Sequence, residues 1–174
     1  MPDMHTTAES VLVAGIGNIF LGDDGFGPEV VRHLAAPGGS ALPESVRPVD
    51  YGIRGMHLVF DLLEGYSALV IVDAVPGHGA PGEVVVLEVG PADLAVLRGE
   101  FDPHGMNPVA VLAGLPAFGG ELPPTYVVGA APESLEAGIG LSQTMSAAVA
   151  PAALAIRELL AARPWALAAT ARQD

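Results

Sequence analysis

Short apolar runs alternate along this chain with segments of helical spacing, and this alternation is the feature that most restricts the possible folds. Each run is short and bounded by turn residues, as is typical of a buried strand. The runs predict strands at Val11–Ala14, Ser45–Tyr51, Ala68–Val72, Glu83–Val89 and Thr125–Ala130. Strands that alternate with helices form mostly parallel sheets covered on both faces. We therefore expect an α/β single-domain three-layer sandwich, with a twisted, mostly parallel sheet of about five strands between helices.

The segments between the runs predict the helices. Pro28 suits the first turn of a helix, and Ser142 suits the N-cap of a final helix that runs to about Ala162. Helical spacing also predicts helices at Gly55–Leu63, Ala92–Arg98 and Pro108–Ala113. The sequence contains no internal repeat and no linker that would separate two domains. We expect one domain over residues 1–174, with flexible tails at 1–9 and 165–174.

The composition excludes several kinds of site and disfavours some kinds of partner. There are no cysteines, which excludes disulfides, thiolate metal sites and a cysteine nucleophile. The 7 basic residues, all arginine, face 20 acidic ones, for a net charge of −13. Such a charge repels nucleic acid and anionic membranes, so we expect neither as a partner. The acidity serves solubility, or it favours a cationic partner such as a metal ion or a basic protein surface.

The apolar runs are all shorter than the roughly 18 to 20 residues needed to span a bilayer. The first ten residues, MPDMHTTAES, lack the basic start and apolar stretch of a signal peptide. We therefore expect a cytoplasmic location.

Aspartates follow three of the predicted strands. Asp23 and Asp24 lie just beyond the first strand, Asp50 ends the second and Asp73 ends the third. In open α/β sheets, ligands bind outside the carboxyl ends of the strands. A single aspartate in such a place is commonly a turn or capping residue, but several on one edge of a sheet predict a site.

The glycine-rich segment Gly15–Gly27 does not fit phosphate binding. A dinucleotide fingerprint needs a glycine three positions after Gly17, where this chain has Phe20. Two aspartates near the helix start would also repel a pyrophosphate, and the chain lacks the lysine of a P-loop. Neither a G-x-S-x-G elbow nor an H-E-x-x-H helix is present. Two adjacent aspartates seldom face each other as an aspartic-protease dyad requires.

A metal site of carboxylates and imidazole remains. Carboxylate oxygens and a histidine nitrogen bind zinc or nickel, and an open position can hold water or substrate. Asp24, Asp73 and one histidine could form such a set. The chain has five histidines, at His5, His33, His57, His78 and His104. The last two lie in predicted loops, and spacing alone does not choose between them.

Several segments together resemble the hydrogenase maturation proteases. The chain begins with a G-x-G-N-x-x-x-x-D-[DE]-G pattern within VLVAGIGNIFLGDDGFGPEVV (11–31) and carries VGAAPESLEAGIGLS late (128–142). Between them lie VDYGIRGMHL (49–58), VIVDAV (70–75) with PG at 81–82, and DPHGM (102–106). The resemblance covers about residues 11–160, and its fold agrees with the sandwich predicted above.

The resemblance implies an endopeptidase that removes the C-terminal extension of the large subunit of a nickel–iron hydrogenase after nickel insertion. The metal-contacting and catalytic positions of the family fall on Asp24, Asp73 and His104, which favours His104 over His78. Nickel would be presented by the precursor rather than held permanently. Asp23 is left as a helix-start or loop-shaping residue, and Arg54 is a variant position that bears on the choice of large subunit. We expect a monomer.

Two other classes of function stay open. One is a non-catalytic binding protein or chaperone for a hydrogenase subunit. The other is a metal-dependent hydrolase on the same scaffold that uses its own ion. Neither the identity of the hydrogenase nor the cleavage sequence can be read from these residues.

Overall fold

The computed structural model describes residues 10–38, 41–90, 92–93 and 110–163. It contains a five-stranded sheet in the order β2-β1-β3-β5-β4. The strands are β1 Val11–Ile16, β2 Val46–Gly52, β3 Ala68–Ala74, β4 Val84–Val89 and β5 Thr125–Ala130. The strand β1 is parallel to β2 and β3, and β3 is parallel to β5. The predicted mostly parallel sheet is thus confirmed.

The strand β4 is antiparallel to its neighbour β5. A parallel neighbour needs a crossover connection of about a dozen residues or more, usually a helix. The connection from β3 to β4 is shorter, and it is rich in glycine and proline (VPGHGAPGE, 75–83). This short connection explains why β4 returns along the sheet edge without a covering helix.

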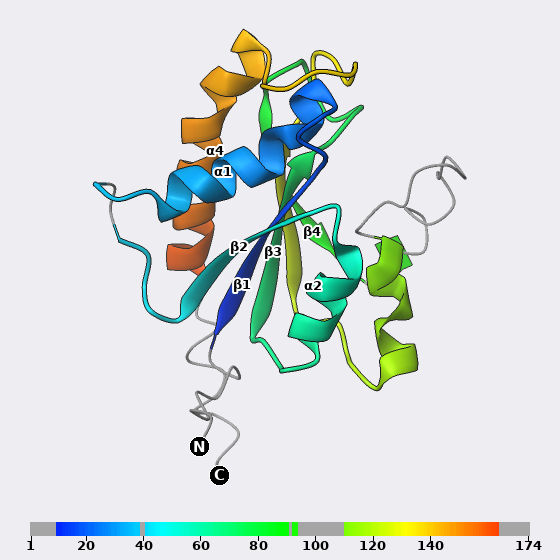
Figure 1. Cartoon of the computed structure of the whole chain (residues 1–174). Coiled ribbons are helices and arrows are strands. Elements are labelled where there is room, and N and C mark those ends of the chain that lie inside the picture. The colour runs from blue at the N-terminus through cyan, green and yellow to red at the C-terminus, as the bar shows by residue number, and fades with distance from the viewer. Residues whose placement is uncertain (1–9, 39–40, 91, 94–109, 164–174) are drawn as a thin grey trace.

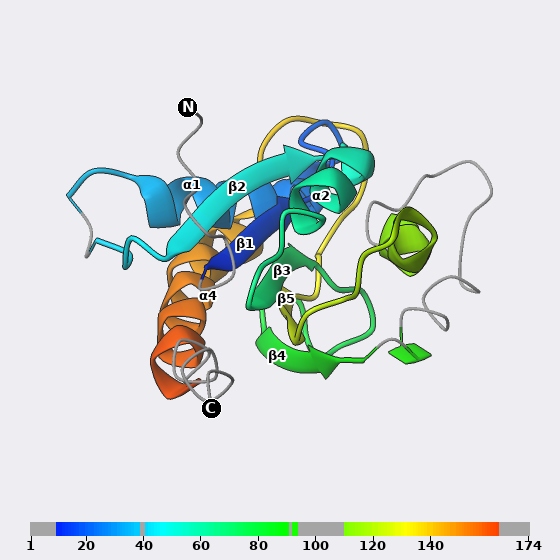
Figure 2. The same cartoon turned by 90° about the horizontal axis from the view of Figure 1, so that it is seen from below.

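Helices cover both faces of the sheet, so the three-layer arrangement is also confirmed (Figures 1 and 2). The helices α1 (Phe26–Ala35) and α4 (Gln143–Ala162) pack on one face. The helix α2 (Gly55–Leu62) and the 3-10 helix η3 (Ala110–Phe118) pack on the other. The N-cap of α4 is Ser142, whose side chain accepts a hydrogen bond from the Met145 backbone N–H, as the sequence predicts.

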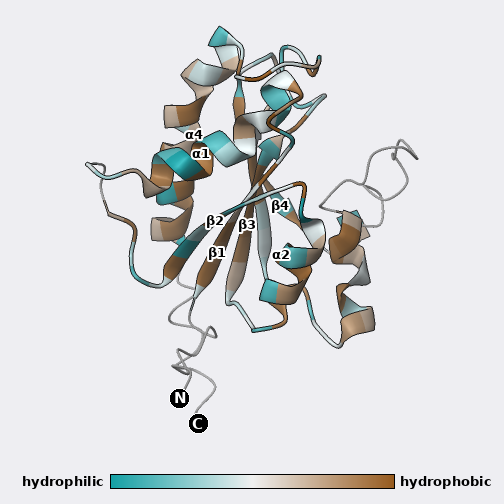
Figure 3. Cartoon of the chain, viewed as in Figure 1, coloured by the Kyte–Doolittle hydropathy of each residue, from teal (hydrophilic) through white to brown (hydrophobic). Residues whose placement is uncertain are grey.

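The two faces of the sheet separate its alternating side chains into two cores. On β1, Val11 and Val13 pack towards α1 and α4, whereas Leu12, Ala14 and Ile16 pack towards α2 and η3. Because both faces are covered, β1 is buried along its whole length, and Figure 3 shows it mostly in the colour of apolar residues.

A pair of hydrogen bonds ties β2 to the segment around α2. Arg47 Nη1 donates to the Tyr66 hydroxyl at 2.7 Å, and the Tyr51 hydroxyl donates to Asp61 Oδ2 at 2.5 Å. Burial and the Asp61 carboxylate both raise the pKa of Tyr51. These contacts lie on the α2 side of the sheet, where Tyr51 and Tyr66 belong to the core.

The helical segment expected from Pro108 to Ala113 differs in type and extent. The structure has the 3-10 helix η3 there, and it continues to Phe118. Pro116 lies inside this helix, and proline cannot donate an intrahelical hydrogen bond. Pro108 itself lies outside the described residues, as do most of the helix expected at Ala92–Arg98 and both expected tails, 1–9 and 165–174.

The helix α4 is long and apolar enough to cross a membrane, by length and composition only. Its apolar residues are interrupted by polar ones, so no uninterrupted apolar run in the sequence indicates this property. Its buried residues pack against α1 and the sheet. A core helix of this kind passes the same length and composition test, so this is weak evidence for a membrane span.

Candidate active site

Asp24 lies in a tight turn that follows β1. This turn ends in the short 3-10 helix η2 (Gly22–Gly25), and α1 begins directly after it. The Asn18 backbone N–H donates to Asp24 Oδ2 at 2.7 Å, which closes the turn on the carboxylate. Asp24 is half-buried. The turn therefore holds one carboxylate oxygen by a backbone contact at the carboxyl end of β1.

Gly17 makes this turn possible. Its φ is +142°, and a Cβ built on it would lie 1.8 Å from the Asp24 carbonyl oxygen. No side chain fits there, so the backbone of Asp24 approaches the strand end directly. The Gly17 N–H also donates to the Gly52 carbonyl at 2.9 Å, which fastens the turn to the end of β2.

Gly27 provides a second close approach. A Cβ there would lie 2.1 Å from the Val72 carbonyl oxygen and 2.3 Å from that of Ile16. The first turn of α1 thus packs directly on the ends of β3 and β1. In a dinucleotide fingerprint, the third glycine permits this kind of helix–strand contact. Here the same contact is made by a glycine further along, in a turn that carries carboxylates.

Asp73 lies near the carboxyl end of β3, the strand next to β1. Burial raises the pKa of its carboxyl well above the ordinary value, and the nearby charge of Asp24 raises it further. The Ala74 backbone amide lowers it, without offsetting the other two causes. The turn after β1 and the end of β3 thus bring two carboxylates, predicted from the sequence, close enough for the charge of Asp24 to disfavour ionisation of Asp73.

A divalent cation would offset this repulsion, because its positive charge attracts both carboxylates. No described arginine forms an ion pair with Asp24 or Asp73. His104, the predicted third member, lies outside the described residues. Within the described residues, no three His, Asp or Glu side chains gather as a metal site requires, so His78 does not complete the set.

Asp23 has surroundings quite different from those of Asp24. Its side chain is 1% exposed. Four donors surround its carboxylate: the backbone N–H groups of Glu133, Ser134 and Ser142, and the Ser142 hydroxyl. Burial alone would raise its pKa, but these hydrogen bonds outweigh burial and hold the pKa below the ordinary 3.8.

Asp23 lies in the first turn of η2, at a helix start as expected, and its carbonyl accepts the hydrogen bond of the Phe26 N–H at the end of η2. Its loop-shaping role is confirmed, with partners far along the chain. The same two segments also exchange backbone hydrogen bonds: Gly22 N–H donates to the Gly138 carbonyl at 2.9 Å and Gly138 N–H to the Phe20 carbonyl at 2.8 Å. The glycine-rich turn and residues 131–142 therefore form one unit.

Asp50, the remaining aspartate of the predicted edge, shapes a turn. Its Oδ1 accepts from the Gly52 N–H at 2.9 Å, and its carbonyl accepts from Arg54 Nη2 at 2.7 Å. Both side chains are exposed. Local hydrogen bonds therefore account for the positions of Asp50 and Arg54.

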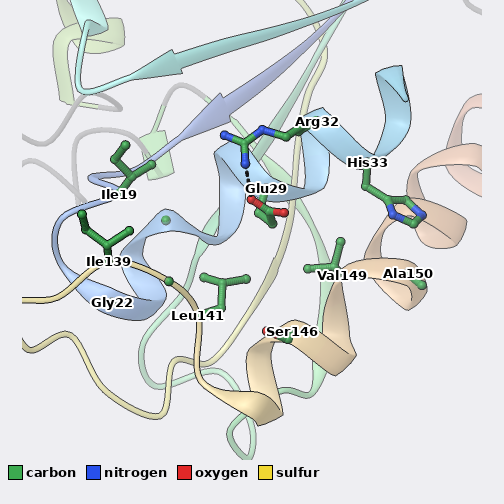
Figure 4. A pocket seen from close by; sticks show the side chains of 12 residues that line it. Ile19, Gly22, Glu29, Arg32, His33, Ile139, Leu141, Ser146, Val149 and Ala150 are labelled. Atoms are coloured by element: carbon green, nitrogen blue, oxygen red, sulfur yellow. Dashed lines mark hydrogen bonds and ion pairs between the residues drawn. The ribbon is translucent and has the colours of Figure 1, made fainter. Parts of the chain in front are cut away.

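A cavity of about 510 Å³ lies between the glycine-rich turn, α1 and the start of α4. Ile19 and Ile139 flank one end of it, and His33 lies towards the other (Figure 4). The ion pair between Arg32 Nη1 and Glu29 Oε2, 2.7 Å long, lies on its α1 side. Neither Asp24 nor Asp73 lines this cavity, so it is distinct from the carboxylate pair.

Comparison with known proteins places the chain in a family. A family model described as hydrogenase maturation protease matches residues 28–159. The chain belongs to the hydrogenase maturation protease family. It is 36% identical to the hydrogenase 2 maturation protease of Escherichia coli strain K12 over 154 residues, which cover 87% of this chain and 89% of that protein. The resemblance found in the sequence is thereby confirmed.

Solved structures of this protease family share the fold. The hydrogenase maturating endopeptidase HybD from E. coli matches with a TM-score of 0.72 and 33% identity, covering 87% of this chain and 91% of that one. The hydrogenase 2 maturation peptidase from a Thaumarchaeota archaeon matches with a TM-score of 0.66 and 31% identity, covering 88% and 99%. This maturation protease is accordingly a peptidase on an α/β sandwich.

Proposed function

We propose that this maturation protease removes the C-terminal extension of the large subunit of a nickel–iron hydrogenase, after nickel has been inserted. The observation that carries the proposal is the pair of carboxylates, Asp24 and Asp73, at the carboxyl ends of two adjacent strands. The relatives are named for hydrogenase maturation, and this supports a hydrogenase precursor as the partner.

Nickel belongs to the substrate in this proposal, held in the immature large subunit. Asp24 and Asp73 are hard oxygen ligands, and a histidine nitrogen from His104 would complete a set suited to nickel or zinc. The precursor's metal would supply a positive charge beside Asp73, which no described arginine pairs with. A precursor without nickel would leave the negative charges of Asp24 and Asp73 without a counter-charge from the metal. We therefore expect cleavage only after nickel has been inserted.

The test is cleavage of a purified precursor, loaded with nickel or free of it, with the C-terminus read by mass spectrometry. We expect the wild-type protein to cleave only the loaded form. Asp24→Asn preserves the size of the side chain and an acceptor for the Asn18 N–H. It should slow cleavage by about 100-fold or more, as expected for loss of a charged group at the reacting centre. Cleavage at the wild-type rate by Asp24→Asn would remove Asp24 from the mechanism.

The two loop histidines provide a matched pair. His104→Ala should abolish processing of the nickel-loaded precursor, because it removes the only nitrogen ligand of the proposed set. His78→Ala should process at close to the wild-type rate, since His78 is exposed and joins no cluster with described acidic side chains. Equal losses of processing from both substitutions would contradict the assignment of His104 as the metal-contacting histidine.

Metal analysis separates this function from its alternatives. The isolated protein should contain no stoichiometric metal. Tightly bound zinc, one per chain, would instead favour a hydrolase with an ion of its own. An unchanged precursor mass after incubation of the nickel-loaded form, together with stable complex formation, would favour a non-catalytic chaperone.

A further inference from the structure

Asp23 joins two parts of the chain that are far apart in sequence. Its Oδ2 accepts from the Glu133 N–H at 2.9 Å and the Ser134 N–H at 3.0 Å, 110 and 111 residues away. The Ser142 N–H donates to Oδ1 at 2.7 Å, and the Ser142 hydroxyl donates to Oδ2 at 2.9 Å. One buried carboxylate thus fixes both ends of the segment from residue 133 to 142.

The same residue lies next to Asp24. The Asp23 N–H donates to the Ser134 carbonyl at 3.1 Å, so its backbone as well as its side chain is fastened to the distant segment. The Asp24 N–H then donates to the Leu21 carbonyl at 3.2 Å, and Asp24 Oδ2 accepts from Asn18 at 2.7 Å. Asp24 is therefore held in two ways. Its own hydrogen bonds close a short local turn, and those of the preceding residue, Asp23, tie that turn to the distant segment.

We propose that Asp23 is a positioning residue, which keeps the carboxylate of Asp24 beside that of Asp73 by fastening the glycine-rich turn to residues 133–142. The inference rests on the proposed role of Asp24. Asp23 itself does not meet the substrate, since its side chain is 1% exposed and both oxygens are taken by internal donors.

The neutral variant Asp23→Asn tests this directly. An asparagine has one acceptor oxygen, and its NH2 group would face donors wherever it is placed. If the oxygen stays opposite Ser142 N–H, the NH2 meets the Glu133 and Ser134 N–H groups. The turn should then shift away from residues 133–142, and the Asp24 carboxylate should move with it.

Two readouts are measured on each variant. The first is the rate of precursor cleavage per folded molecule, which should fall by about 10- to 100-fold, as misplacement by about an ångström can do. The second is the NMR signal of the Asn18 amide proton, which reports the hydrogen bond to Asp24 Oδ2 without any substrate. In Asp23→Asn this signal should move upfield and the proton should exchange faster with solvent.

Three further variants separate positioning from general loss of stability. Tyr66→Phe removes a hydrogen bond from a buried side chain on the other face of the sheet, and should leave the Asn18 signal and the rate per folded molecule unchanged. Ser142→Ala removes one of the four donors to Asp23 and should give smaller changes in the direction of Asp23→Asn. Ser142→Thr retains the hydroxyl and should restore both readouts.

If Asp23→Asn does not fold, Ser142→Ala carries the test with the same two readouts. An unchanged Asn18 signal in a folded Asp23→Asn or Ser142→Ala protein would overturn the positioning role, whatever the cleavage rate. A shifted Asn18 signal with a normal rate per folded molecule would overturn it as well. If the wild-type protein fails to cleave the nickel-loaded precursor, the proposed function fails, and the positioning role falls with it, even where the Asn18 signal shifts.

Discussion

Asp23 and Asp24 are adjacent residues of the same type whose side chains meet opposite conditions. The carboxylate of Asp23 is buried among four donors and has a lowered pKa. The carboxylate of Asp24 has one backbone donor and lies near a second carboxylate, Asp73. Donors surrounding a charge stabilise the fold, whereas two like charges held together destabilise it. The first arrangement is thus structural, and the second is typical of a functional site.

Asp73→Asn should therefore make the metal-free protein more stable and inactive. The substitution removes a charge that burial and Asp24 both disfavour, so the free energy of unfolding at pH 7.5 should rise by about 1 to 2 kcal/mol. Cleavage of the nickel-loaded precursor should be lost. Urea denaturation and the cleavage assay measure the two effects on the same preparation.

The pH dependence of this difference follows from the raised pKa of Asp73. In the unfolded chain the carboxyl ionises near 3.8, and in the folded protein only at higher pH. The stability cost of Asp73 is thus absent below about pH 3.8, grows as the pH rises and is complete above the folded pKa. The gap between Asp73→Asn and wild type should be smaller at pH 5 than at pH 7.5. A gap that widens on acidification would contradict the assigned sign.

At the scale of elements, contacts between backbones place the site. The first turn of α1 touches the ends of β1 and β3 because Gly27 has no side chain, and the turn before it closes because Gly17 has none. Both contacts bring the chain that carries Asp24 down onto the sheet edge. The geometry of the carboxylate pair therefore depends on helix–strand packing as much as on the aspartates.

Gly27→Ala should be strongly destabilising. A methyl group there would lie within 2.1 Å of a strand carbonyl, so α1 must move away from the sheet. We expect a loss of about 1 to 3 kcal/mol in the free energy of unfolding, or more if α1 cannot shift. Gly114→Ala is the matched control, since a Cβ at Gly114 meets nothing within 4 Å. Chemical denaturation of both variants measures this, and equal small effects would show that α1 is not closely packed at Gly27.

The strand-end rule predicted Asp23, Asp24, Asp50 and Asp73 at one edge of the sheet, and the resemblance to the protease family distinguished Asp24 from Asp23. The same local patterns predicted β5 and the Ser142 cap of α4. The partners of Asp23 could not be predicted in this way, since they lie 110 or more residues away and no local pattern relates them. The direction of β4 was also not predicted; the short glycine- and proline-rich connection before it was a signal that could have been used.

At the scale of the whole molecule, two cores share one sheet. One core lies under α1 and α4 and the other under α2 and η3, and alternate residues of the same strands belong to each. Neither core can lose its packing without exposing one face of those strands. The described part of the chain should therefore unfold as one cooperative unit.

A substitution in either core should then shift the same transition. Ile156→Ala on the α4 side and Leu115→Ala on the η3 side each remove a buried aliphatic side chain. Each should lower the free energy of unfolding by about 2 to 5 kcal/mol. Far-UV circular dichroism and tyrosine fluorescence should report one common midpoint in urea for each variant. Two separate midpoints would show that the faces unfold independently.

The long-range hydrogen bonds of Asp23 determine when its turn can be held in place during translation. A ribosome makes the chain from its N-terminus, so the turn that carries Asp24 emerges long before residues 133–142, to which it is hydrogen-bonded. Among the described residues, the hydrogen bonds to the Asp23 side chain come from Glu133, Ser134 and Ser142. Until Ser142 has left the ribosome, the turn lacks its full set of hydrogen bonds to residues 133–142. In a nascent chain, Asp23 could therefore make these hydrogen bonds only after residues 133–142 have emerged.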